Sequence, residues 1–140
     1  MKICVLAVLL LIMLSGCQGQ EDEVYEVSDR FFATQMHGIL FNSDEYMGRT
    51  IRFTGMFFSS QWGDPGQPTE TFYYVGRFGE ECCAPGDFMG LEVYLGDIPV
   101  ADDFSWVSVT GVLGRKYIQD FGEVIYLHTL SMEEVDIPGL

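Results

Sequence analysis

The chain has 140 residues, of which 48% are hydrophobic, and its 21 acidic and 7 basic side chains give a formal net charge of −14 at pH 7. This length supports one domain with a single hydrophobic core. The acidic surface repels phosphate backbones, so we expect no nucleic acid among the partners. It also disfavours close contact with anionic lipid head groups.

Residues 1–16 are predicted to be a lipoprotein signal peptide. Lys2 supplies the positive charge, residues 3–14 form an apolar run, and the sequence LSGC ends at Cys17. The run is too short for a durable membrane span, and LSGC fits the bacterial lipobox. We therefore expect a lipid at Cys17, a flexible tether over residues 17–26, and an extracytoplasmic protein anchored in the bacterial cell membrane or outer membrane. An ordinary signal peptide with a chance cysteine is the alternative.

The next segment, residues 27–42, is predicted to contain an amphipathic helix. Ser28 or Asp29 is the candidate N-cap, Asn42 is the candidate end, and Gly38 weakens the last turn. Apolar side chains recur at helical spacing: Phe31, Phe32, Met36, Ile39 and Leu40. They would share one face, and we expect the helix to close one end of a barrel formed by the segments that follow.

From residue 49 the apolar pattern has a period of two, which predicts strands. IRFTGMF (51–57) and VSVTGVL (107–113) share a pattern with an internal glycine, which is typical of a bulge or barrel corner. Further strands are expected at 72–78, 89–95 and 123–130. The pattern indicates a mainly β fold over residues 27–140, a small five-stranded OB-like antiparallel barrel with an N-terminal helix packed on one end. A β-sandwich is the alternative.

The sequence EECCAPG places Cys82 and Cys83 side by side before a turn. Adjacent Cα atoms lie about 3.8 Å apart, below the usual disulfide range of about 4.4 to 6.8 Å, so a vicinal disulfide would be strained. The pair lacks the spacing of a zinc knuckle, whereas soft ions such as Cu(I) need fewer ligands. Three interpretations stay open: a soft-metal site with Asp87 among the candidate ligands, a redox pair, and packing at the barrel rim.

Other polar and aromatic residues are predicted to have structural roles. Arg77 is expected to pair with Glu80, Glu81 or Asp87 and so to hold the cysteine turn. His37 is expected to face solvent on the helix, and His128 is expected to be a satisfied edge or core histidine. Phe58 and Trp62 flank the longest loop and are candidates for an aromatic contact patch. Because the chain has no nucleophile elbow, no HExxH and no phosphate loop, we expect no enzyme, and catalysis by a Cys/His pair assembled in space is the third alternative.

Several motifs in sequence order resemble one family: NSDEYMGRTIRFTG (42–55), YVGRF (74–78), CCA (82–84), GLEV (90–93) and WVSVTG (106–111). From about Val27 to Val135 the chain is similar to the C-terminal extracytoplasmic domain of the DUF1980 (YcgQ-like) proteins. The resemblance implies supporting roles for Arg77, Phe78 and Trp106 beside the cysteine pair.

Members of that family carry two membrane helices before this domain and are typically encoded beside a permease of the YraQ-like type. The resemblance therefore implies an accessory subunit of a transport system, here with a lipid anchor in place of the two helices. We expect a binding or accessory module whose partner is a permease or another envelope protein. The alternative is a soft-metal-binding or thiol-redox protein that uses Cys82 and Cys83.

Overall fold

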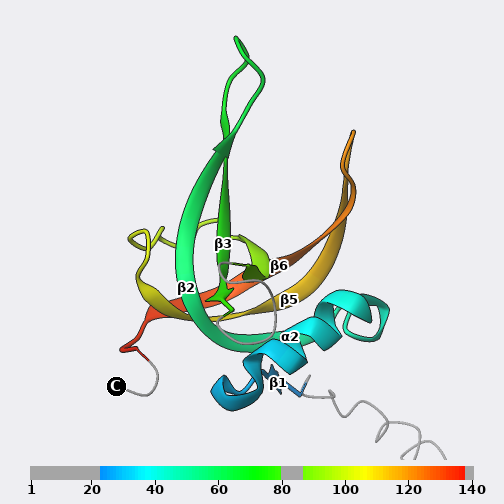
Figure 1. Cartoon of the computed structure of the whole chain (residues 1–140), viewed down its shortest axis with the longest axis vertical. Helices are drawn as coiled ribbons and strands as arrows, with labels where there is room; N and C mark the ends of the chain where they lie inside the picture. Colours follow the sequence, from blue (N-terminus) through cyan, green and yellow to red (C-terminus); the bar gives the residue numbers. More distant parts are fainter. Residues whose placement is uncertain (1–22, 80–86, 138–140) are drawn as a thin grey trace, which may run out of the picture.

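The computed structural model describes residues 23–79 and 87–137. In chain order they form β1 (Tyr25–Glu26), η1 (Asp29–Phe31), α2 (Phe32–Phe41), η2 (Ser43–Glu45), β2 (Thr50–Trp62), β3 (Glu70–Phe78), β4 (Phe88–Tyr94), β5 (Trp106–Ile118) and β6 (Gly122–Glu134). Strands β2, β3, β4, β6 and β5 pair in that order, and β5 pairs again with β2 to close a barrel. Figure 1 shows how strongly these strands curve. The predicted five-stranded barrel with one N-terminal helix is confirmed.

The directions of the strands are mixed, whereas the sequence led us to expect an antiparallel barrel. β4 runs parallel to β6, with Glu92 opposite Tyr126, and the other neighbours in the ring are antiparallel. A closed ring with an odd number of strands cannot alternate direction throughout, so one pair must be parallel. The connection from β4 to β5 allows this because it leads the chain across the barrel.

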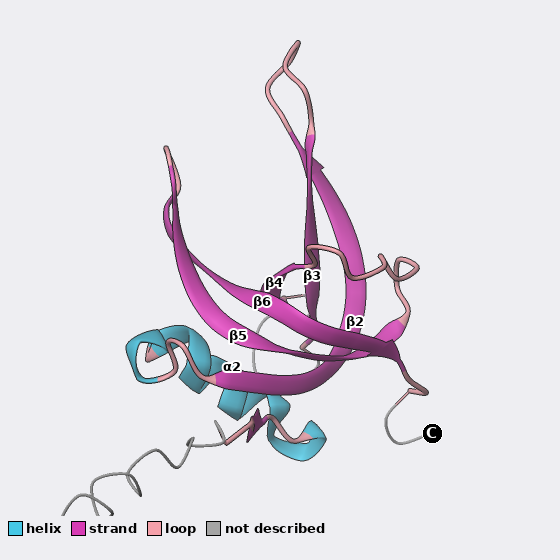
Figure 2. Cartoon of the chain, turned by 180° about the vertical axis from the view of Figure 1, so that it is seen from behind, coloured by secondary structure: helices cyan, strands magenta, loops and turns pink. Residues whose placement is uncertain are grey.

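The N-terminal helix lies across one end of the barrel, as predicted (Figure 2). Ser28 is the cap: its Oγ accepts a hydrogen bond from the backbone N–H of Phe31 at 3.2 Å. The helix begins with a 3₁₀ turn, η1, continues as α2 and ends at Phe41 with Asn42 as its C-cap, as predicted. The side chains of α2 that enter the core are Phe32, Met36 and Ile39.

Alternate strand residues fill the barrel, as the period of two predicts. Gly111 lies at the register shift between β5 and β6, where a Cβ would be 2.5 Å from the carbonyl oxygen of His128. The predicted glycine bulge is therefore confirmed at this position. The largest fully buried side chains are Phe53, Phe57, Met36, Ile39, Ile51, Leu91, Leu113, Leu127, Val75, Val93, Val107 and Val109.

Parts of the predicted organisation fall outside the described residues. These are the signal peptide, Cys17, most of the tether, and Cys82 with Cys83. Within residues 23–79 and 87–137, no helix has the length and apolar character needed to span a bilayer.

Candidate binding site on the barrel

The β2–β3 and β5–β6 hairpins extend beyond the barrel on the same side (Figure 1). A groove of about 500 Å³ is lined by residues 70–73 of β3, residues 92–94 of β4, the loop that follows β4, and Lys116 of β5. In OB barrels, ligands bind on the face of the second and third strands and on the loops beside them. Because β3 and β4 are the second and third strands of this barrel, the groove is the candidate ligand site.

Among the described residues that line the groove, Lys116 is the one cation, and it is already paired. The Lys116 ammonium forms an ion pair with Glu92, and its Nζ lies 5.4 Å from the ring centroid of Phe72 and 5.6 Å from that of Tyr126. The Glu92 side chain is only 10% exposed. Glu70, at the rim, makes no ion pair with any described residue. The groove is thus slightly acidic, and Lys116 is not free to attract an anion.

Tyr94 presents an aromatic ring beside the groove. It is 56% exposed and stacks on His128 with a centroid distance of 5.6 Å. His128 is itself exposed, which excludes the core position of the predicted edge or core histidine. His37 is exposed on α2 as predicted, where it stacks on Phe41 at 4.0 Å.

Arg77 does not hold the cysteine turn through Asp87. Its Nε and one terminal nitrogen donate to the carbonyl oxygen of Thr54 at 3.0 and 2.8 Å, and its guanidinium forms an ion pair with Asp29. The guanidinium carbon also lies 4.3 Å from the ring centroid of Phe32. Glu80 and Glu81, the other two predicted partners, lie outside the described residues. The prediction was therefore wrong for Asp87, and Arg77 instead connects the start of the helix to β2 and β3.

Of the other residues implied by the family resemblance, Trp106 lies at this contact and Phe78 faces the other side of β3. The ring centroid of Trp106 is 5.4 Å from the guanidinium carbon of Arg77. The carbonyl oxygen of Asp87 accepts a hydrogen bond from the N–H of Gly79 at 2.9 Å, which joins the two described ends of the β3–β4 connection. Cys82 and Cys83 lie outside the described residues. In the two described ranges, no three His, Cys, Asp or Glu side chains are grouped as metal ligands.

A cluster of aromatic rings covers the outer side of β2, β3 and β4. The ring centroid of Phe58 lies 5.2 Å from that of Tyr74 and 4.8 Å from that of Phe88, and Phe88 lies 5.6 Å from Phe78. We call these four residues the aromatic face. Burial, with a smaller contribution from the charge of Glu92, raises the pKa of Tyr74.

Two glycines make room for the aromatic face. A Cβ on Gly76 would lie 2.5 Å from Cζ of Phe88 and 2.4 Å from the carbonyl oxygen of Met89, and a Cβ on Gly90 would also meet Phe88 at 2.6 Å. The Phe88 ring therefore covers the backbone where two strands carry no side chain. The sequence prediction included Phe58 in a contact patch but paired it with Trp62 and missed Tyr74 and Phe88. The available signal was the alternation of aromatic residues and glycines along β3 and β4.

Comparisons with known proteins give one match. The model of the DUF1980 C-terminal domain matches residues 16–139. The comparisons with curated proteins and with solved structures found no match. Since the family model covers nearly the whole chain, the chain belongs to the DUF1980 C-terminal domain family.

Proposed function

We propose that this protein is a lipid-anchored, extracytoplasmic binding module that serves as an accessory subunit of a membrane permease or another envelope protein. The observation that carries the binding role is the groove of about 500 Å³ on β3 and β4. Ligand sites are usually such concave, mostly apolar surfaces with a few polar groups. The link to a permease rests on the family resemblance, and the use of this face rests on analogy with other OB barrels.

The anchor is proposed from the sequence around Cys17. The lipobox LSGC would place a lipid on Cys17, and the polar run QGQEDE would connect that lipid to the barrel. The net charge of −14 would keep the barrel from lying on anionic head groups. The groove would then be presented to the extracytoplasmic space, close to proteins of the same membrane.

The lining of the groove favours a small neutral or cationic solute with a flat apolar side. Lys116 is neutralised by Glu92, so the charge left over at the groove is that of Glu70. Phe72 and Tyr94 offer aromatic faces, which attract cations and pack on flat apolar groups. An anion would meet Glu70 without an available cation in the groove.

A thermal-shift screen of the full chain in detergent tests the binding role. The panel consists of small amines, sugars and organic acids, added to wild type, to Tyr94→Ala and to the control Phe41→Ala. Phe41 is 74% exposed and lies on α2, away from the groove residues. We expect amines or sugars to raise the melting temperature of wild type and Phe41→Ala but not of Tyr94→Ala. Stabilisation by organic acids, or stabilisation that persists in Tyr94→Ala, would contradict the proposal.

The second candidate function is soft-metal binding or thiol redox chemistry at Cys82 and Cys83. The favouring observation is that Phe78 pairs with Phe88 and Gly79 N–H bonds to Asp87, so both cysteines lie in one short connection. Metal content and free thiols of the chain, purified without chelator, test this function against Cys82→Ser/Cys83→Ser. Metal in a one-to-one ratio that the double variant lacks would support it. Two free thiols and no metal would argue against it.

A further inference from the structure

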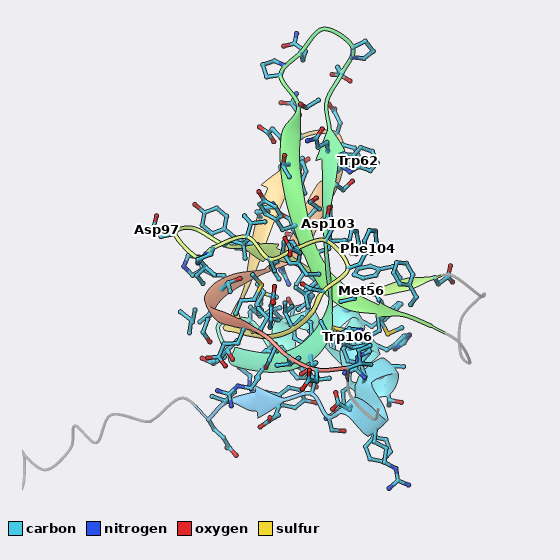
Figure 3. All side chains as sticks on the ribbon, turned by 90° about the vertical axis from the view of Figure 1, so that its left-hand side faces the viewer. Met56, Trp62, Asp97, Asp103, Phe104 and Trp106 are labelled. Carbon is cyan, nitrogen blue, oxygen red and sulfur yellow. The ribbon has the colours of Figure 1, made fainter. Side chains whose placement is uncertain are left out.

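A further exposed aromatic residue, Phe104, lies on the connection before β5. The N–H of Phe104 donates to the carbonyl oxygen of Phe57 at 2.7 Å, so Phe104 lies beside β2, the strand that carries Phe58. Figure 3 labels Phe104 between Trp62 and Met56 of β2, and Trp106, the first residue of β5, pairs with Met56. Phe104 is 67% exposed and Phe78 is 46% exposed. Phe104 therefore adds a second largely exposed ring, beside the strand that carries Phe58, to the exposed ring of Phe78.

Phe104 has a backbone conformation that a phenylalanine rarely adopts. Its φ is +68°, in the left-handed region that glycine and asparagine adopt more readily than other residues. The carboxylate of Asp103 holds this conformation, since it accepts from the N–H of Ser59 at 2.7 Å and from its Oγ at 3.0 Å. A strained residue whose ring is mostly in solvent gains little from packing. Strain of this kind, kept in place by its surroundings, is characteristic of sites that contact a partner.

Carboxylates border the aromatic side chains. Asp102 and Asp103 precede Phe104, Asp87 precedes Phe88, and all three are exposed. None of them forms a salt bridge with a described residue. A second copy of the chain would bring the same carboxylates to the contact, and an anionic lipid surface would be repelled. A protein with Lys or Arg around an apolar contact point would be attracted.

We infer that the aromatic face together with Phe104 is a docking surface for another protein, one that presents an apolar contact point ringed by basic residues. The inference rests on the proposed accessory role and adds the surface and the partner's chemistry. Phe104, which is more exposed than Phe78, is the anchor, and the aspartates set the charge of the rim. Large interface aromatics at the centre and charged residues at the rim are the usual arrangement.

The size of the surface indicates a modest interface. An aromatic residue buries about 150–250 Å² when it is fully covered. Because Phe104 is 67% and Phe78 46% exposed, the two together expose roughly 200 Å². A standard interface buries about 800 Å² on each partner. The exposed rings are therefore the core of a contact whose remaining area comes from the polar rim.

Photo-cross-linking in the cells that produce the full-length chain tests the inference. A photo-reactive phenylalanine analogue replaces Phe104, and control chains carry it at Phe121 or Phe41, which are both 74% exposed. We expect position 104 to form an adduct with a different protein, on a peptide in which an apolar residue is flanked by Lys or Arg. Asp87→Asn with Asp102→Asn is expected to lower the yield about two- to fivefold.

Several outcomes would overturn the inference. An adduct between two copies of the chain, a lipid adduct, or a partner peptide flanked by acidic residues would each identify the wrong occupant. A protein adduct from position 121 or 41 but not from 104 would place the docking surface elsewhere and leave the accessory role intact. No protein adduct from any of the three positions would argue against the accessory role as well.

A second variant separates docking from folding. In Phe104→Asn, with the photo-reactive analogue at Phe78, we expect the adduct to fall by about tenfold or more, as for an interface anchor. The melting temperature of this variant should be no lower than wild type, because asparagine tolerates a positive φ. An adduct at the wild-type level would show that Phe104 is not the anchor.

Discussion

The contact between Arg77 and the start of the helix gives the sharpest stability prediction. Arg77→Met keeps an unbranched side chain but removes the guanidinium. Loss of the hydrogen bonds to the carbonyl oxygen of Thr54 costs about 1.5–3 kcal/mol, because the donor is charged. The contact over Phe32 adds about 0.5–1 kcal/mol, and the partly exposed ion pair with Asp29 adds about 0–1 kcal/mol. We therefore expect the free energy of unfolding to fall by about 2–5 kcal/mol.

Arg30→Met is the matched control. Arg30 lies over the exposed ring of Phe31 at 5.4 Å and makes no hydrogen bond or salt bridge with a described residue. Both variants remove one positive charge from a chain of net charge −14, so the change in overall repulsion is similar. A surface change of this kind costs at most about 0.5 kcal/mol.

Urea unfolding of the full chain in detergent, followed by tryptophan fluorescence, measures the difference. We expect a clearly lower midpoint for Arg77→Met than for Arg30→Met, with similar slopes. Equal midpoints would refute the reasoning that Arg77 is structural. Arg77 would then be available for the supporting role beside the cysteine pair that the family resemblance implies.

Three further outcomes are expected. Gly76→Ala should lower the free energy of unfolding, measured in urea, by about 3 kcal/mol, because the new Cβ would meet backbone atoms. Gly38→Ala, on the helix and with room for a Cβ, should raise it by about 0.5–1 kcal/mol. The reverse order would contradict the described packing. The pKa of Tyr74 is raised in the folded state, so protonated Tyr74 contributes stability below the ordinary tyrosine pKa, and this contribution is lost as the pH rises through the raised pKa. Tyr74→Phe should therefore remove a late step from the absorbance titration of the tyrosines. Cys17→Ser should abolish labelling by radioactive palmitate and release the protein from membranes, and a labelled variant would disprove the anchor at Cys17.

The barrel could be predicted because its signals are local. Alternating apolar residues identify the strands, and Gly111 identifies a bulge, since both depend on a few neighbouring positions. The parallel pair β4–β6 follows from closing an odd number of strands, which requires the complete strand count and not only the patterns. The helix on the barrel end was also predictable, because its buried side could not remain in solvent.

The aromatic face could not be predicted in full because it depends on register between distant segments. Phe58 meets Tyr74 only because β2 and β3 pair in this register, and Phe88 reaches them across Gly76. Phe104 joins the surface through backbone bonds to β2 that no local pattern indicates. Likewise, the partner of Arg77 is Asp29, which lies 48 residues earlier and on a different element.

The central claim is that the groove on β3 and β4 binds a small solute, and native mass spectrometry tests it most directly. The full chain would be released into detergent from the membranes of the cells that produce it, without washing steps that remove weak ligands. The account predicts a bound neutral or cationic small molecule in wild type and in Phe41→Ala, and its loss in Tyr94→Ala. A wild-type chain that carries no small molecule, or a bound molecule that persists in Tyr94→Ala, would contradict the account.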